Sequence, residues 1–215
     1  MCLLLALQLD IDFRLHYPDS LGAFVSNFPS MVPRVIAAAR LSRKTAVVEL
    51  VREYDVELHQ PVPASRDLMY AVLCLLHLLQ SSSTRHKARI SSVELESQLL
   101  TFRPQQTSID LFLEEKKRST HKQPFLLCLG SRENPSSYFL VLDGKAVCLG
   151  ECGVVRAVDC LFKSHFVYWV DYGKPLALFM EFLQKLIYKI DCTKLTASVR
   201  ELHNSMTALT DNADQ

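Results

Sequence analysis

One dipeptide, Asp143-Gly144, constrains the fold of this chain more than any other feature. It lies between the short apolar runs LVL and KAVCL, and both central residues of a two-residue type I′ turn need positive φ, which Asp-Gly tolerates. A third apolar run, Phe125 to Gly130, comes just before and is separated by SRENPSS, a cluster of turn-forming residues. The sequence therefore predicts three antiparallel strands.

Two amphipathic helices are expected after these strands, over about 154–170 and 175–190. We expect both to cover one face of the sheet, with Asp159 and Lys163 paired on the solvent side of the first helix. Four large side chains are predicted to share the core beneath them: Phe162, Trp169, Phe179 and Leu183.

The N-terminal half has the spacing of helices. We expect a short helix containing Gly22 that ends at Pro29, another beginning near Ser30, and a third over 45–54. A nearly all-apolar helix over 65–80 is expected to be central. A capping pattern, Ser91 with Glu94, and a cap at Thr107 or Ser108 predict two further short helices.

The predicted fold class is α+β: a helical N-terminal half plus a small antiparallel β unit covered by two C-terminal helices. The predicted regions are a helical region 1–83, an α+β region 90–192 and a C-terminal tail 193–215 with one weak helix and a frayed end. These regions would also be compatible with one continuous domain.

Composition limits the function classes. Hydrophobic residues make up 49%, enough for a proper core, and 24 basic against 23 acidic side chains leave a net charge of +1, which gives no global attraction to nucleic acid or anionic membrane. Seven cysteines, an odd number mostly inside apolar runs, fit reduced thiols and an intracellular, cytoplasmic or nuclear location. The N-terminal apolar run lacks the basic start and cleavage site of a signal peptide, no run of about 18 apolar residues occurs, and we expect no membrane association.

Cys148, Cys152, Cys160 and His165 are the weak candidates for metal or nucleophilic chemistry. The single Cys-x3-Cys pair is looser than zinc knuckles, so no metal is expected. Cys152 lies just before a helix, where a thiolate is favoured, but His165 is about three turns further along that helix, roughly 20 Å away. The sequence therefore predicts no catalytic residue, unless His16 or His121 approaches through the tertiary fold.

No glycine-rich phosphate loop is present, and no cofactor is expected. Aromatic residues beside His165 are expected to be core. Two short basic clusters, 85–89 and 116–118, are interpreted as solvated segments, although they would be the contact points for nucleic acid.

The segments PFLLCLG (124–130), SYFLVLDGKAV (137–147), AVDCLFKSHFVYWVDYGKPL (157–176) and FLQKLIYKI (182–190) resemble a vertebrate, especially fish, protein family. That family includes the C-terminal regions of sterile alpha motif domain-containing protein 3-like chains and of fish C2H2 zinc-finger proteins. The resemblance extends upstream through PASRDLMYAVLCLLHLL and implies the same order of strand, hairpin and two helices. It implies no catalytic position, and neither a sterile alpha motif nor a finger precedes Ser20.

The function expected from these observations is a non-enzymatic protein-interaction or scaffolding module with a protein partner. The alternatives are a nucleic-acid-associated regulator, derived from a mobile element, and a cysteine-dependent hydrolase.

Overall fold

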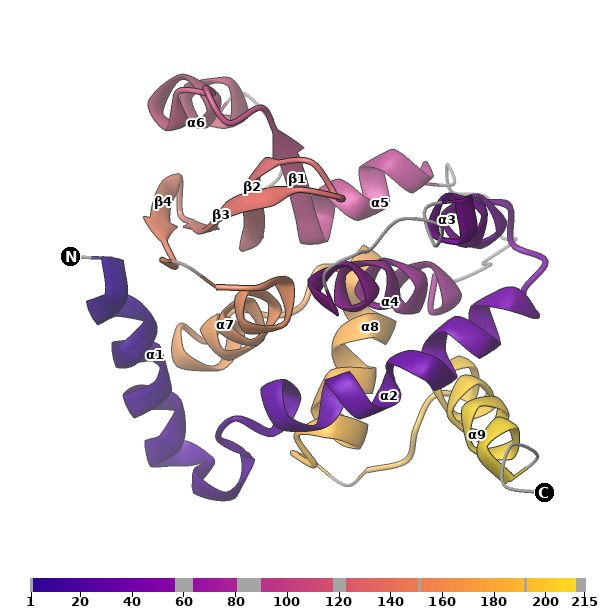
Figure 1. The fold of residues 1–215 in the computed structure, drawn as a ribbon. Coiled ribbons are helices and arrows are strands. Elements are labelled where there is room, and N and C mark those ends of the chain that lie inside the picture. The colour runs from indigo at the N-terminus through magenta and orange to yellow at the C-terminus, as the bar shows by residue number, and fades with distance from the viewer. Residues whose placement is uncertain are drawn as a thin grey trace. The chain divides into compact units, whose positions relative to one another are not determined.

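The computed structural model describes residues 2–56, 64–80, 90–117, 123–150, 152–191 and 193–211. The chain forms two compact units, each assembled from two segments that are far apart in sequence: unit 1 is Met1–Gly22 with Val93–Lys174, and unit 2 is Ala23–Ser92 with Pro175–Gln215. Helices combined with one small sheet place the chain in the α+β class, which confirms the prediction (Figure 1). The two units interleave along the chain.

Unit 1 contains the sheet. Its elements are α1 (Cys2–His16), a 3₁₀ turn η1 (Pro18–Ser20), α5 (Ser92–Leu99), β1 (Leu100–Arg103), α6 (Ile109–Lys117), β2 (Phe125–Gly130), β3 (Pro135–Leu142), β4 (Lys145–Cys148) and α7 (Val154–Val167).

The strand order is β1-β2-β3-β4, and β2, β3 and β4 are antiparallel as predicted. β1 runs parallel to β2 and was not predicted, because Leu100 continues the apolar spacing of the preceding helix. Leu100 is buried in the strand instead, and Pro104 follows the strand directly.

The two faces of the sheet carry different helices, α6 on one and α7 on the other (Figure 1). Phe112 of α6 packs in one cluster with Phe125, Leu127 and Val141 of the strands. The alternate strand residues point to the opposite face, where α7 contacts β2 and β3 and α1 in turn packs on α7. Strand alternation thus builds two separate hydrophobic layers.

Left-handed backbone marks the turns of unit 1. Asp143 and Gly144 have φ of 49° and 69°, which confirms the predicted hairpin turn. Gly130 has φ of +110°, and a Cβ there would lie 2.4 Å from the backbone oxygen of Asn134. Gly22 has φ of +76° and precedes the next helix, so the expectation that it lies within a helix was wrong.

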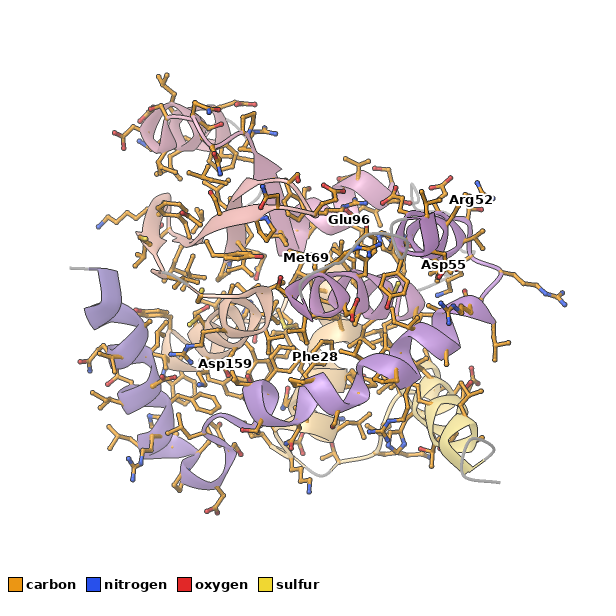
Figure 2. The ribbon with its side chains drawn as sticks, in the orientation of Figure 1. Phe28, Arg52, Asp55, Met69, Glu96 and Asp159 are labelled. Carbon is orange, nitrogen blue, oxygen red and sulfur yellow. The ribbon has the colours of Figure 1, made fainter. Side chains whose placement is uncertain are left out.

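Unit 2 is helical. Its elements are α2 (Ala23–Arg40), α3 (Thr45–Val56), α4 (Ala64–Leu78), a 3₁₀ turn η3 (Lys174–Leu176) at its boundary, α8 (Ala177–Phe182), a π-helical turn η4 (Leu183–Ile187) and α9 (Ala197–Asp211). Phe28 on α2 and Met69 on α4 are fully buried, and α4 is buried nearly all round as predicted (Figure 2).

The predicted break at Pro29 was wrong, since α2 continues through Pro29 and Pro33. Both prolines are exposed, so the carbonyl groups that lose their intrahelical partner lie on the solvent side. The opposite face buries Phe24, Phe28 and Val35, and this burial outweighs the proline penalty of about 3 kcal/mol.

The C-terminal segments also differ from expectation. α7 covers the sheet as predicted, whereas α8 groups by its contacts with unit 2 and packs on α9. The helix predicted in the tail is present as α9, and it is not weak, since it packs on α2 and buries Val199 and Met206. Among the helices that the structure describes, none is both long and apolar enough to cross a membrane.

Candidate protein-docking surface

A charged cluster fastens α1 to α7. Asp10 of α1 accepts hydrogen bonds from Arg156 (Nη2 to Oδ2, 2.6 Å) and from Lys163 (Nζ to Oδ1, 2.6 Å), and Lys163 also donates to Asp159 at 2.7 Å. Asp159 points from α7 toward α1 (Figure 2). Two acids and two bases therefore compensate one another at the contact between these helices.

The expectation that Asp159 and Lys163 lie on the solvent side was wrong, since they are 0% and 1% exposed. The reason is α1, a helix that the sequence reading left unassigned and that covers this face of α7. Burial would raise the pKa of Asp10, but the hydrogen bonds from Arg156 and Lys163 outweigh it and hold that pKa below its ordinary value.

α1 is apolar on two sides. Its inner side buries Leu9 and Phe13, and the Phe13 ring meets those of Phe162 and Phe166 edge-on. Its outer side exposes Leu7, Ile11 and Leu15, which are 50%, 54% and 77% exposed. Residues four apart share one helix face, so these three side chains form a continuous outer row, here called the α1 stripe.

The C-terminal end of α7 is closed by a Schellman motif, a capping turn with two reversed hydrogen bonds. The Trp169 N–H donates to the Phe166 oxygen at 3.4 Å, and the Val170 N–H donates to the His165 oxygen at 2.9 Å. Trp169 therefore occupies the position that glycine usually takes, and its φ is 53°. Its side chain is 84% exposed, so the prediction that Trp169 belongs to the core was wrong.

His165 stabilises this cap through a side-chain hydrogen bond. Its Nδ1–H donates to the Val170 oxygen at 2.9 Å, which makes the neutral ring an Nδ1–H tautomer. Its Nε2 is buried and has no hydrogen-bond partner among the described residues. Burial lowers the pKa of His165 more than the bond to Val170 raises it, so the ring is neutral at pH 7. These contacts assign His165 to the backbone turn that presents Trp169.

Trp169 meets the end of α1. Its ring lies edge-on to His16, with centroids 6.3 Å apart, and His16 follows Leu15 of the α1 stripe. Tyr168, 41% exposed, adds a second aromatic side chain at the cap. We call the α1 stripe together with His16, Tyr168 and Trp169 the Trp169 surface.

Of the cysteine candidates, Cys148 ends β4, Cys152 lies just before α7, and Cys160 lies in the middle of α7. Cys148 and Cys152 are half-buried, Cys160 is buried, and all three are free thiols. Burial raises the pKa of Cys152 to about 11 and of Cys160 to about 12, which keeps both protonated at neutral pH. A protonated thiol is a poor nucleophile and a poor metal ligand.

Cys128, which the sequence reading did not single out, faces Tyr138 across the β2–β3 pair, and burial raises its pKa to about 11. Among the described residues, no group of three or more His, Cys, Asp and Glu side chains is arranged to hold a metal ion. Within the residues that the structure describes, the candidate cysteines and His165 therefore do not form a metal-ligand set.

The described part of the basic clusters, Lys116 and Lys117, gives little free positive charge. Lys117 pairs with Glu114, and the Lys116 Nζ lies over the Phe112 and Phe125 rings. The cluster 85–89, Arg118 and His121 lie outside the described residues.

The α1 stripe was missed by sequence reading, although its signal is present. Leu7, Ile11 and Leu15 recur every four residues, while Leu9 and Phe13 form a second row two positions out of step. Two rows of opposite phase predict a helix that is apolar on both sides.

Comparison of the chain with family models, with characterised proteins and with solved structures gives no match.

Proposed function

We propose that this chain is a non-enzymatic protein-interaction module that holds a partner protein through the Trp169 surface. The observation that carries the proposal is Trp169 itself: a large aromatic side chain, 84% exposed, at a left-handed position that favours glycine. A non-glycine residue in this conformation costs about 1–2 kcal/mol. A side chain that costs folding energy and contributes no core burial is explained by a use outside the fold.

The surroundings of Trp169 support the same reading. Tryptophan is the residue most typical of the energetic centre of protein interfaces, and contiguous exposed apolar patches mark interaction sites. The α1 stripe extends the patch from Leu15 back to Leu7, about 12 Å at 1.5 Å per residue.

The dimensions of this surface favour a helix as the partner segment. A row about two turns long, with polar Gln8 and Asp12 on one side and Arg14 on the other, suits an amphipathic helix lying alongside α1. The opposite charges beside the row would set its direction: basic side chains of the partner toward Asp12 and acidic ones toward Arg14.

The alternatives have less support. Lys116 and Lys117 are engaged with aromatic rings and Glu114, which leaves these two described members of the 116–118 cluster with little free charge for nucleic acid. The raised thiol pKa values of Cys152 and Cys160 argue against a cysteine nucleophile.

Intrinsic fluorescence tests the proposal, because Trp169 is the only tryptophan of the chain. Proteins retained by the immobilised chain would be identified, and a tryptophan-free fragment of each would be titrated into it. The proposal expects the Trp169 emission to shift toward the blue and acrylamide quenching to fall on binding. Binding that leaves both signals unchanged would place the partner elsewhere and overturn the proposal.

Variants distinguish specific binding at the Trp169 surface from nonspecific hydrophobic binding. Trp169→Gly and Ile11→Ser should each weaken binding about tenfold or more, the range of an interface hot spot. Val93→Ser is the matched control, since Val93 is 79% exposed on α5 and lies outside the surface. Equal losses in all three variants would contradict a site at Trp169.

A further inference from the structure

β4 leaves one row of backbone hydrogen-bonding groups free. In the two-residue hairpin, Leu142 and Lys145 bond to each other, so Ala146 and Cys148 must turn their N–H and C=O groups to the outer edge. The Leu149 N–H bond to the Tyr138 oxygen, at 2.9 Å, fixes the same alternation further along. β4 ends the described sheet, and Ala146 has no hydrogen-bond partner on that side among the described residues.

A groove of about 440 Å³ lies between α6 and the start of β4. Its floor includes Gly144 and Ala146, two small residues, and its wall is one face of α6. The wall residues Ile109, Leu113 and Lys117 recur every four positions, so the whole length of α6 lines the groove. An edge strand beside a helix that lines the same groove is a geometry in which proteins add an extended peptide to a sheet.

The charges of the groove identify its class of occupant. Its lining holds two acids, Asp110 and Glu114, and two bases, Lys117 and Lys145, so it gives no net attraction for a phosphate backbone. Glu114 and Lys117 pair with each other, whereas Asp110 and Lys145 have no ion pair with any described residue. The occupant must therefore match one free acid and one free base.

We propose that this groove binds an extended peptide from another protein, which adds to the outer edge of β4 as a further strand. Its backbone bonds to Ala146, its alternate apolar side chains lie against Ile109 and Leu113, and it carries a basic side chain toward Asp110 and an acidic one toward Lys145. The site is separate from the Trp169 surface and does not depend on it.

The test begins with a displayed library of random octapeptides selected on the full chain. The best sequence, made as a synthetic peptide, is titrated while amide hydrogen exchange is followed at Ala146. The proposal expects the Ala146 N–H to become protected on peptide binding, because a main-chain bond then covers it. Selection of no peptide above background, or binding without protection of Ala146, would overturn the proposal.

Ala146→Pro removes the outward N–H, a change that edge strands tolerate. It should weaken the peptide about threefold to tenfold, the loss of one main-chain hydrogen bond, while Ala146→Ser keeps the N–H and should bind normally. If Ala146→Pro fails to fold, Asp110→Asn, on the exposed side of α6, should weaken a basic peptide and change the melting temperature little.

Two further results decide the occupant and the site. Protection of Ala146 that rises with chain concentration in the absence of peptide would show that a second copy covers the edge, and would overturn the proposal. Trp169→Gly should bind the peptide normally, so a failure at the Trp169 surface and a failure at this groove give different results.

Discussion

The body of α7 and its C-terminal cap each hold one large aromatic residue, and the two residues differ in exposure. Phe162 and Trp169 are seven positions apart, a spacing that places them on one face of a continuous helix. Phe162 is fully buried in unit 1, whereas Trp169 is 84% exposed. The difference arises because α7 ends at Val167, and the left-handed backbone at Trp169 turns the side chain out of the helical row.

The comparison teaches that periodicity describes a side chain only as far as its helix extends. In the body of α7, burial in the core determines which residue type is suitable. At the cap, the backbone turn determines which way the side chain points. Trp169 is disfavoured by the turn and is not used by the core. Such a residue is the clearest sign of a requirement for binding.

The largest expected effect separates these two aromatics. Phe162→Ala should lower the free energy of unfolding by about 3–5 kcal/mol, because it leaves a cavity in the core. Trp169→Ala should change it by less than about 0.5 kcal/mol, as expected at the surface. Urea melts of both variants measure the difference, and similar losses would show that Trp169 packs inward in solution.

A second prediction separates backbone strain from steric clash at left-handed positions. Gly130→Ala should lose about 3 kcal/mol or more, because strain adds to a Cβ placed 2.4 Å from the Asn134 oxygen. Gly144→Ala and Gly22→Ala should each lose only about 1 kcal/mol, since both have positive φ but open space around the Cβ.

Thermal or urea melts rank the three glycine variants. Near-equal losses at Gly144 and Gly22 are expected, because Gly22 lies at a turn instead of in a helix. A loss at Gly130 no larger than at Gly144 would contradict the close approach of Asn134.

The third prediction concerns the pH dependence of stability that arises from His165, which stabilises the cap of α7. The folded-state pKa of His165 is lowered, so the unfolded chain binds a proton more readily, and stability from this group is complete above its unfolded pKa of about 6.5. As the pH falls from about 6.5 toward the lowered folded pKa, stability should fall by at most about 1.4 kcal/mol per pH unit.

His165→Asn supplies the control, since its amide can donate to the Val170 oxygen but does not titrate. Asp10, with a pKa below its ordinary 3.8, does not contribute in this range. Urea melts at pH 7.5 and 5.5 should show a smaller change for the variant than for the native chain; equal changes would show that His165 does not carry the effect.

The smallest effect has the opposite sign. Trp169→Gly should raise the free energy of unfolding by about 1 kcal/mol, because glycine adopts the left-handed cap without strain. Trp169→Ala keeps the Cβ and should not gain. A destabilised glycine variant would show that contacts of the indole outweigh the strain of the cap.

Sequence reading recovered the elements whose signals are local. Asp143-Gly144 specifies its own turn, and the apolar runs on either side specify β2, β3 and β4. The class α+β and the burial of α4 follow from composition and periodicity in the same way.

What was missed depends on contacts between distant segments. β1 is a strand because β2 lies beside it, and the charges of Asp159 and Lys163 are buried because α1 covers them. The Trp169 surface was missed for a related reason: its row on α1 and its tryptophan on the cap become neighbours only in the folded unit.

The charged cluster between α1 and α7 has a consequence for biosynthesis. Asp10 bonds to Arg156 and Lys163, which follow it by 146 and 153 positions. At 5–20 residues per second, α1 would wait roughly 7 to 30 s on the ribosome before its partner helix is made. During that interval both apolar rows of α1 and its uncompensated aspartate are open to chaperones, so unit 1 can be completed only late in translation.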